Sequence, residues 1–324
     1  MEFRTVVPPL RHQGLISHHT GLLMLGSCFT DNVSSRLADD LFDVTANPCG
    51  TLYNPLSIAN AIDRMISTRE YTAEDLFLHQ GLWRSLDHHS SLCSSDKKRA
   101  LELINGGLRN GIEALRRAGA LIVTWGSSTA YIDRLTGQCA ANCHKLPSER
   151  FEVAALTPEQ IVSRWLQVIR AVRQINPDVT LIITVSPIRH KAYGLDGNSL
   201  NKARLIEAAH QLADREKGVI YFPSYEIMMD DLRDYRFYAA DMIHPSETAC
   251  DYIYDIFAKS FFDEPTSQLA RQSRRLTRRM RHRIMTDDPT ALEMERAEIN
   301  NLISSHITAY PQTERAIERI KSRI

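Results

Sequence analysis

The stretch Gly21-Leu22-Leu23-Met24-Leu25-Gly26-Ser27-Cys28-Phe29-Thr30 decides the fold class of this 324-residue chain. A short apolar run stops at a glycine, two small nucleophilic side chains follow, and a segment rich in capping residues opens an amphipathic helix. This order predicts a strand, a tight turn and a helix. The turn places Ser27 and Cys28 at the carboxyl edge of a parallel sheet, where N–H groups at a helix N-terminus favour an anion. On this stretch alone, a buried Cys28 and a helix-capping Ser27 explain the pattern equally well.

Further apolar runs extend the strand and helix pattern along the chain. Helix patterns separate them, which implies crossover connections and a parallel sheet covered on both faces. We therefore expect a three-layer α/β/α sandwich with a mainly parallel five-stranded sheet, of the doubly wound, flavodoxin-like kind. The expected strands are 21–25, 41–45, 121–125, 180–185 and 219–222, and the expected helices include 54–66, 97–118, 157–174, 199–214 and 246–262. We interpret 68–95 as an insertion and 137–151 as irregular.

The composition changes after residue 262. Seven arginines lie between Arg271 and Arg283, and helical patterns without strand signals continue to the end. We therefore divide the chain into an α/β domain, 1–262, and a helical, arginine-rich extension, 263–324. The extension is interpreted as a solvated helical hairpin, a homodimer arm or a basic contact surface, and a run of charge is most often a solvated helix face.

The overall composition indicates a soluble globular protein. The formal net charge is zero, 43% of the residues are hydrophobic and 24% are charged, so neither a nucleic-acid nor a membrane partner is expected. The first twelve residues lack the apolar run of a secretory signal, and we expect a cytoplasmic protein. Six irregularly spaced cysteines are typical of reduced thiols rather than of a disulfide framework.

A second informative stretch is Asp241-Met242-Ile243-His244-Pro245-Ser246. An aspartate and a histidine three residues apart, in a turn before a helix, can place the imidazole over the sheet edge while the carboxylate holds its other nitrogen. A surface histidine in a helix-entry turn is the simpler interpretation. The motif follows the last crossover unit, however, so it should lie at the same sheet edge as Cys28.

These stretches together resemble the bacterial GSCFA domain family, which is related to the GDSL or SGNH hydrolases. The resemblance rests on Gly26 to Thr30, Tyr53-Asn54-Pro55, Val185-Ser186-Pro187, Phe222 to Glu226 and Asp241 to Pro245, and it covers about residues 3–262. It implies a hydrolase through kinship with the SGNH enzymes.

The resemblance also implies roles for particular residues. It puts Cys28 where the nucleophilic serine of the SGNH pattern stands, with Ser27 at the aspartate position. Asp241 and His244 match the last block of that pattern. Gly50 is the expected donor of a backbone N–H to the oxyanion. The third block falls on 126–129 and lacks its asparagine, so Ser128, Asn54 or Asn142 would have to replace it.

Several loop residues are weaker candidates. Cys139, Cys143 and His144 have a spacing that suggests a metal, but no second pair completes four ligands, so we expect no metal and no other cofactor. The remaining candidates lie in loops at the predicted carboxyl edge, where open sheets bind ligands. The predicted substrate-binding set is Asn54, His89, His144, Arg189 and His190, with Arg189 suited to a carboxylate or phosphate.

Three functions are consistent with the sequence. The first is an acyl hydrolase, an esterase, thioesterase or deacetylase, that uses a Cys28-His244-Asp241 triad on a small acyl ester or acylated sugar, with Ser27 as the alternative nucleophile. The second is an acyltransferase with the same triad. The third is a catalytically silent binding or assembly protein, which the missing asparagine and the cysteine in place of serine favour.

Overall fold

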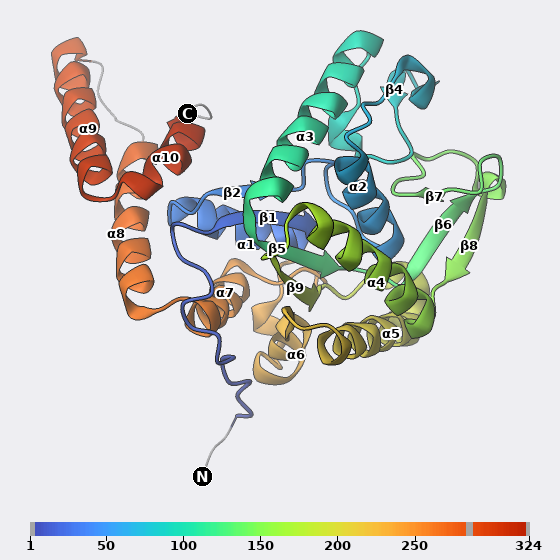
Figure 1. Cartoon of the computed structure of the whole chain (residues 1–324). Coiled ribbons are helices and arrows are strands. Elements are labelled where there is room, and N and C mark those ends of the chain that lie inside the picture. Colours follow the sequence, from blue (N-terminus) through green and yellow to red (C-terminus); the bar gives the residue numbers. More distant parts are fainter. Residues whose placement is uncertain (1–3, 283–287, 322–324) are drawn as a thin grey trace.

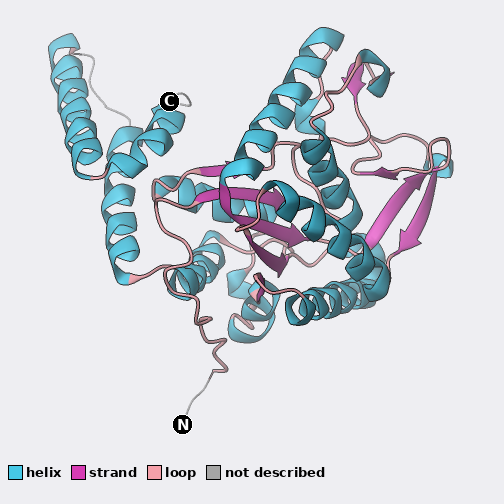
Figure 2. Ribbon diagram, in the orientation of Figure 1, coloured by secondary structure: helices cyan, strands magenta, loops and turns pink. Residues whose placement is uncertain are grey.

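The computed structural model describes residues 4–282 and 288–321. Its centre is a sheet of five parallel strands in the order β10-β9-β5-β1-β2, which is the flavodoxin-like arrangement (Figure 2). The predicted α/β/α fold is therefore confirmed. The strands are β1 (Gly21–Gly26), β2 (Val44–Ala46), β5 (Ala118–Trp125), β9 (Thr180–Val185) and β10 (Val219–Phe222).

Helices cover both faces of this sheet (Figure 1). Side chains alternate along each strand, so Leu23 and Leu121 pack into one core while Leu22 and Ile122 pack into the other. The first core is completed by α2 (Pro55–Ser67), α3 (Lys97–Arg117), α4 (Pro158–Ile175) and α5 (Gly194–Arg215). The second is completed by α1 (Cys28–Asp39), α7 (Glu247–Phe261) and the π-helical turn Ile227–Asp231, which follows the short α6 (Ser224–Glu226).

The helix starts follow the predicted capping residues. The Asn54 side chain accepts a hydrogen bond from the backbone of Ser57, and Pro55 takes the first helical position of α2. Helix α3 is unbroken despite its three glycines. A Cβ at Gly107 would lie 2.1 Å from the Pro48 oxygen, so this glycine lets the helix approach the loop before α2.

The structure differs from the sequence prediction in the loops. The segment 137–151, predicted to be irregular, contributes to a small antiparallel sheet of β6 (Thr129–Asp133), β7 (Cys139–Ala140) and β8 (Phe151–Ala155). The expected insertion at 68–95 contains a hairpin of β3 (Phe77–His79) and β4 (Leu82–Arg84). Such short strands carry little periodicity, since their pairing depends on contacts made in the fold.

The C-terminal extension is helical, as predicted, and it packs against the α/β sandwich. It comprises α8 (Glu264–Arg281), α9 (Pro289–Ala309) and α10 (Glu314–Lys321), which share a core with Leu41. Arg274 bonds both oxygens of the buried Asp40, at 2.6 and 2.7 Å, and Arg281 pairs with Asp39. Part of the arginine-rich run therefore forms ion pairs within the chain, whereas Arg283 lies outside the described residues. A homodimer through this extension stays a prediction.

The described residues contain neither a membrane-spanning helix nor a cluster of metal ligands. No helix in 4–282 or 288–321 has both the length and the apolar character needed to cross a bilayer. Within the same residues, no three His, Cys, Asp or Glu side chains gather as metal ligands.

Candidate functional site

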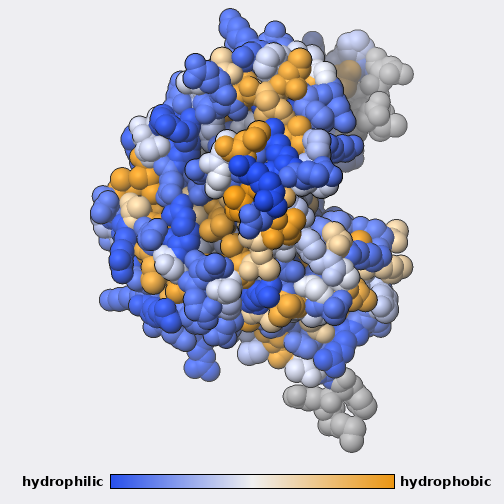
Figure 3. Space-filling model, turned by 90° about the vertical axis from the view of Figure 1, so that its right-hand side faces the viewer, coloured by the Kyte–Doolittle hydropathy of each residue, from blue (hydrophilic) through white to orange (hydrophobic). Residues whose placement is uncertain are grey.

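A cavity of about 500 Å³ opens where β1 and β5 end, at the point where the strand order reverses. Figure 3 views the molecule from the side on which β5 runs into β6, and hydrophobic residues gather around the middle of that otherwise mostly hydrophilic face. The cavity combines tyrosines and aliphatic side chains with a few polar groups, the usual composition of a small-molecule site. Its lining includes Ser27, Cys28, Tyr53, Asn54, Gly126, Ser127, Thr129, Tyr131, Ser186, Ile188, His190, Lys191, Tyr193, Lys202, Ile243 and His244.

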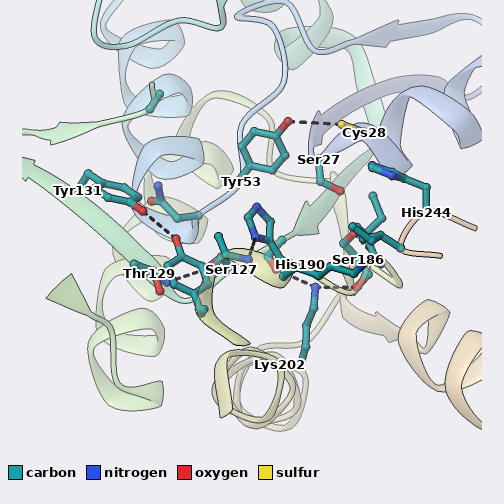
Figure 4. A pocket seen from close by; sticks show the side chains of 18 residues that line it. Ser27, Cys28, Tyr53, Ser127, Thr129, Tyr131, Ser186, His190, Lys202 and His244 are labelled. Atoms are coloured by element: carbon teal, nitrogen blue, oxygen red, sulfur yellow. Dashed lines mark hydrogen bonds between the residues drawn. The ribbon is translucent and has the colours of Figure 1, made fainter. Parts of the chain in front are cut away.

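The two candidate nucleophiles have different surroundings. Ser27 is 1% exposed and caps α1, with its hydroxyl oxygen accepting a hydrogen bond from Phe29 N. Cys28 is the first residue of α1 and is half-buried at the cavity. Its sulfur lies 3.4 Å from the hydroxyl oxygen of Tyr53, which also lines the cavity (Figure 4). The thiol is therefore the more accessible of the two groups.

Tyr53 contacts both Cys28 and the residues that follow β5. Its carbonyl oxygen accepts hydrogen bonds from the amides of Gly126, at 2.7 Å, and Ser127, at 3.0 Å. Burial raises the pKa of the Tyr53 hydroxyl, and the neighbouring Cys28 adds to the effect. The hydroxyl is therefore a neutral hydrogen-bond donor over the physiological pH range.

His244 and Asp241 form a close pair at the cavity mouth. His244 Nδ1 lies 2.5 Å from Asp241 Oδ2, and Asp241 Oδ1 accepts hydrogen bonds from the amides of Ile243 and His244. These hydrogen bonds, led by that from the His244 amide, hold the pKa of the Asp241 carboxyl well below its usual range. Since Nδ1 is occupied, Nε2 is the nitrogen free for a ligand, and Figure 4 shows the His244 ring directed toward the Ser27–Cys28 turn.

Asn54 places an amide group at the same cavity. Its Oδ1 accepts hydrogen bonds from Ser57 N at 2.8 Å and from Cys139 Sγ at 3.6 Å, which fixes the orientation of the amide. Its Nδ2 donates to no residue in the described part of the chain. This nitrogen is therefore a donor available to a ligand.

The hydroxyls of the loop after β5 are bonded to α5. Asn201 Oδ1 accepts from the hydroxyls of Ser127, Ser128 and Thr129 at 2.8 to 3.0 Å. Ser128 is fully buried and does not line the cavity. The structure thus uses these hydroxyls to hold the loop on α5, so they are not available to an oxyanion.

Lys202, the next residue of α5, lies in the floor of the cavity. It is 2% exposed, and its Nζ donates to Gly126 O at 2.7 Å and to Ser186 O at 2.8 Å. Burial lowers its pKa to about 7, and the charge of Arg189 adds to this shift. Lys202 joins the carboxyl ends of β5 and β9.

Two residues of the predicted substrate-binding set line the cavity, Asn54 and His190. The His190 ring stacks on Tyr193, with 5.5 Å between ring centroids. Tyr193 Oη lies 3.0 Å from Tyr131 Oη, so a tyrosine from the loop before α5 meets one from the small sheet. The two tyrosines form a wall of the cavity from two separate segments.

Seven of the predicted site residues do not line the cavity. The amide of Gly50 donates to Asn47 O within a turn, and the glycine has a φ of +74°. The side chain of His144 bonds Ser85 O, 59 residues away, at 2.7 Å. Those of Asn142 and His89 accept hydrogen bonds from the nearby amides of His144 and Ser91. Arg189 Nη1 approaches the sulfur of Met229 at 3.6 Å. The seven residues absent from the lining are Gly50, His89, Ser128, Asn142, His144, Arg189 and Asp241. Of these, Asp241 still contacts a lining residue, His244.

The sequence interpretation missed Tyr53, Ser186, Asn201 and Lys202 as parts of the site. A signal existed for the last two, because Asn198, Asn201 and Lys202 occupy the stripe of α5 that continues into buried apolar residues. Polar side chains on a buried helix stripe need partners. The partners, however, come from the ends of β5 and β9, which only the fold brings there.

Comparison with known proteins identifies a family and similar solved structures. The profile of the GSCFA family matches residues 21–257. No curated protein matches the sequence. Among solved structures, an acetyl xylan esterase from the rumen bacterium Butyrivibrio proteoclasticus is similar, with 12% identity and a TM-score of 0.34. The match covers 79% of this chain and 65% of the esterase.

Proposed function

This chain belongs to the GSCFA family, and from its cavity we propose that it is an acyl hydrolase in which Cys28 is the nucleophile, His244 the general base and Asp241 the residue that orients it. One observation carries the proposal: Cys28 and a histidine already paired with a carboxylate line one cavity at the strand ends. Nucleophile, base and orienting carboxylate are the groups that acyl transfer needs.

The reaction proceeds in two steps. His244 Nε2 takes the thiol proton as Cys28 Sγ attacks the carbonyl carbon of an ester or thioester. The tetrahedral intermediate collapses, the leaving alcohol or thiol receives the proton from His244, and a thioester remains on Cys28. Water then gives a proton to His244 and attacks the thioester, which releases a carboxylic acid and restores the thiol.

Two donors suit the oxyanion of that intermediate. The backbone N–H of Cys28 is among the first amides of α1, which have no acceptor within the helix. Asn54 Nδ2 is the second, and it takes the place of the asparagine that the loop 126–129 lacks. A preorganised donor of this kind is worth about 3 kcal/mol of transition-state stabilisation.

The surroundings of Ser27 favour Cys28 as the attacking group. A nucleophilic serine needs a hydroxyl that is exposed to substrate and bonded to a base, whereas the Ser27 hydroxyl is buried and caps α1. The thiol of Cys28 lies at the cavity, where a substrate can reach it.

The proposal is tested with a panel of short-chain aryl esters and thioesters. We expect Cys28→Ala and His244→Ala to lose activity by at least about 10³-fold, and Ser27→Ala to lose far less. A covalent acyl adduct on Cys28, detected by mass spectrometry of His244→Ala incubated with a thioester, would be direct support. Unchanged turnover in Cys28→Ala and His244→Ala would overturn the triad. If Ser27→Ala alone were inactive, the serine would be the nucleophile instead.

A further inference from the structure

The proposed chemistry leaves the buried Lys202 at the cavity floor without a role. Lys202 Nζ carries three N–H groups and donates two of them to Gly126 O and Ser186 O. In Figure 4 the side chain rises from α5, and its ammonium lies between these two strand ends at the floor of the cavity. The third N–H is therefore available to a molecule in the cavity.

Within residues 4–282 and 288–321, no carboxylate pairs with this ammonium. None of the residues lining the cavity is an aspartate or a glutamate, and every one of them belongs to the described chain. The charged residue that acts on Lys202 is Arg189, which has the same sign. The Tyr225 ring, with its centroid 5.9 Å from Nζ, offers only a π face.

An ammonium held in this way costs free energy, because two carbonyl dipoles compensate only partly for lost hydration. The pKa of Lys202, lowered by burial to about 7, reflects this cost. An anion in the cavity would offset it. His190 and Lys191 line the same cavity, so the nearby groups add to the preference for negative charge.

We propose that the acyl substrate carries a carboxylate, in addition to the bond that is cleaved, and that this carboxylate accepts a hydrogen bond from Lys202 Nζ. A single remaining N–H suits one carboxylate oxygen, whereas phosphate groups are generally held by several donors. The inference rests on the proposed acyl-hydrolase function, whose reaction centre, Cys28 and His244, lies on the same cavity.

The experiment compares two nitrophenyl esters of equal chain length, the monoester of glutaric acid and the ester of pentanoic acid. We expect the wild-type protein to favour the charged ester in kcat/KM by about 10- to 100-fold. Lys202→Met should bring this ratio close to one. Lys98→Met, which removes an exposed lysine of α3, is the matched control and should keep the wild-type ratio.

Two results would overturn the inference while leaving the hydrolase function intact: equal turnover of both esters by the wild-type protein, or loss of the preference in Lys191→Met instead of Lys202→Met. The wild-type ratio needs no variant, so it decides the question even where Lys202→Met does not fold.

If neither ester is turned over, the hydrolase function fails, and calorimetric titration with glutarate then tests the charge separately. Glutarate binding by the wild-type protein that is lost in Lys202→Met supports the carboxylate site. Absence of binding, or equally tight binding of inorganic phosphate, overturns it.

Discussion

The hydroxyl oxygen of Tyr53 lies 3.4 Å from the sulfur of Cys28. Tyr53 belongs to the loop before α2, and its backbone also binds the end of β5. Tyr53 thereby holds two parts of the site: its hydroxyl faces the thiol, and its carbonyl binds the amides of Gly126 and Ser127. Removal of the hydroxyl alone separates these two effects, because the backbone contacts stay.

We expect Tyr53→Phe to slow the alkylation of Cys28 by iodoacetamide at pH 7 about tenfold. The reason is that a hydroxyl donor stabilises a thiolate more than a thiol. The rate is followed by mass spectrometry of the peptide containing Cys28. Tyr252→Phe, which removes a hydroxyl bonded to Asp231 away from the cavity, is the control. Equal rates in the two variants would contradict a role for the Tyr53 hydroxyl at the thiol.

Asn54 has two roles that a pair of substitutions can separate. Asn54→Asp and Asn54→Ser both keep an oxygen that can cap α2, and neither retains the amide N–H groups. We expect kcat to fall about 10²- to 10³-fold in both, while the free energy of unfolding changes by less than about 1 kcal/mol.

The matched control is Asn60→Asp, the same change six residues further along, within α2 and outside the cavity lining. Steady-state kinetics and urea unfolding measure the two quantities. Near-normal kcat in both Asn54 variants would mean that the oxyanion has another donor.

Arg274 ties the C-terminal extension to the sandwich. It bonds both oxygens of Asp40, which is 1% exposed and also accepts a hydrogen bond from Tyr254. We expect Arg274→Ala to lower the free energy of unfolding by about 3 kcal/mol, because a buried carboxylate loses its charge partner. Arg275→Ala, at the next and exposed position of α8, should change it by less than about 0.5 kcal/mol. Chemical denaturation of both variants tests this, and similar values would show that the ion pair contributes little.

Acid should destabilise the protein through His18. Burial lowers its pKa from the usual value near 6.5 to about 4, although Nε2 lies 2.9 Å from Asp40 O. Between these two pH values the unfolded chain binds a proton that the folded chain does not. The stability that neutral His18 contributes is therefore fully present above pH 6.5. As the pH falls to about 4, the free energy of unfolding decreases by roughly 3 kcal/mol.

The measurement is urea unfolding between pH 4 and pH 7. His18→Gln keeps an N–H donor without the titration, so its free energy of unfolding should fall less steeply with acid than that of the wild-type protein. His19→Gln, at the exposed neighbouring position, should keep the wild-type slope. Parallel profiles for all three proteins would exclude His18 as the source.

The sheet is encoded locally in the amino-acid sequence, because its strands are buried runs that stop at turn residues. The run Gly21 to Leu25, the capping asparagine before Pro55 and the stretch Asp241 to Pro245 each act locally, through apolar periodicity, backbone capping or a three-residue spacing. The pairing of Asp241 with His244 was for that reason predictable from the chain alone.

Only the tertiary structure decided which polar groups reach the cavity. Lys202 lies 76 residues from Gly126 and 16 from Ser186, and its burial follows from the side-by-side packing of β5, β9 and α5. Gly50, by contrast, has a suitable sequence position, but a local turn takes its amide. Hydrogen-bond partners far apart in sequence depend on strand order and helix packing, and no local pattern encodes those contacts.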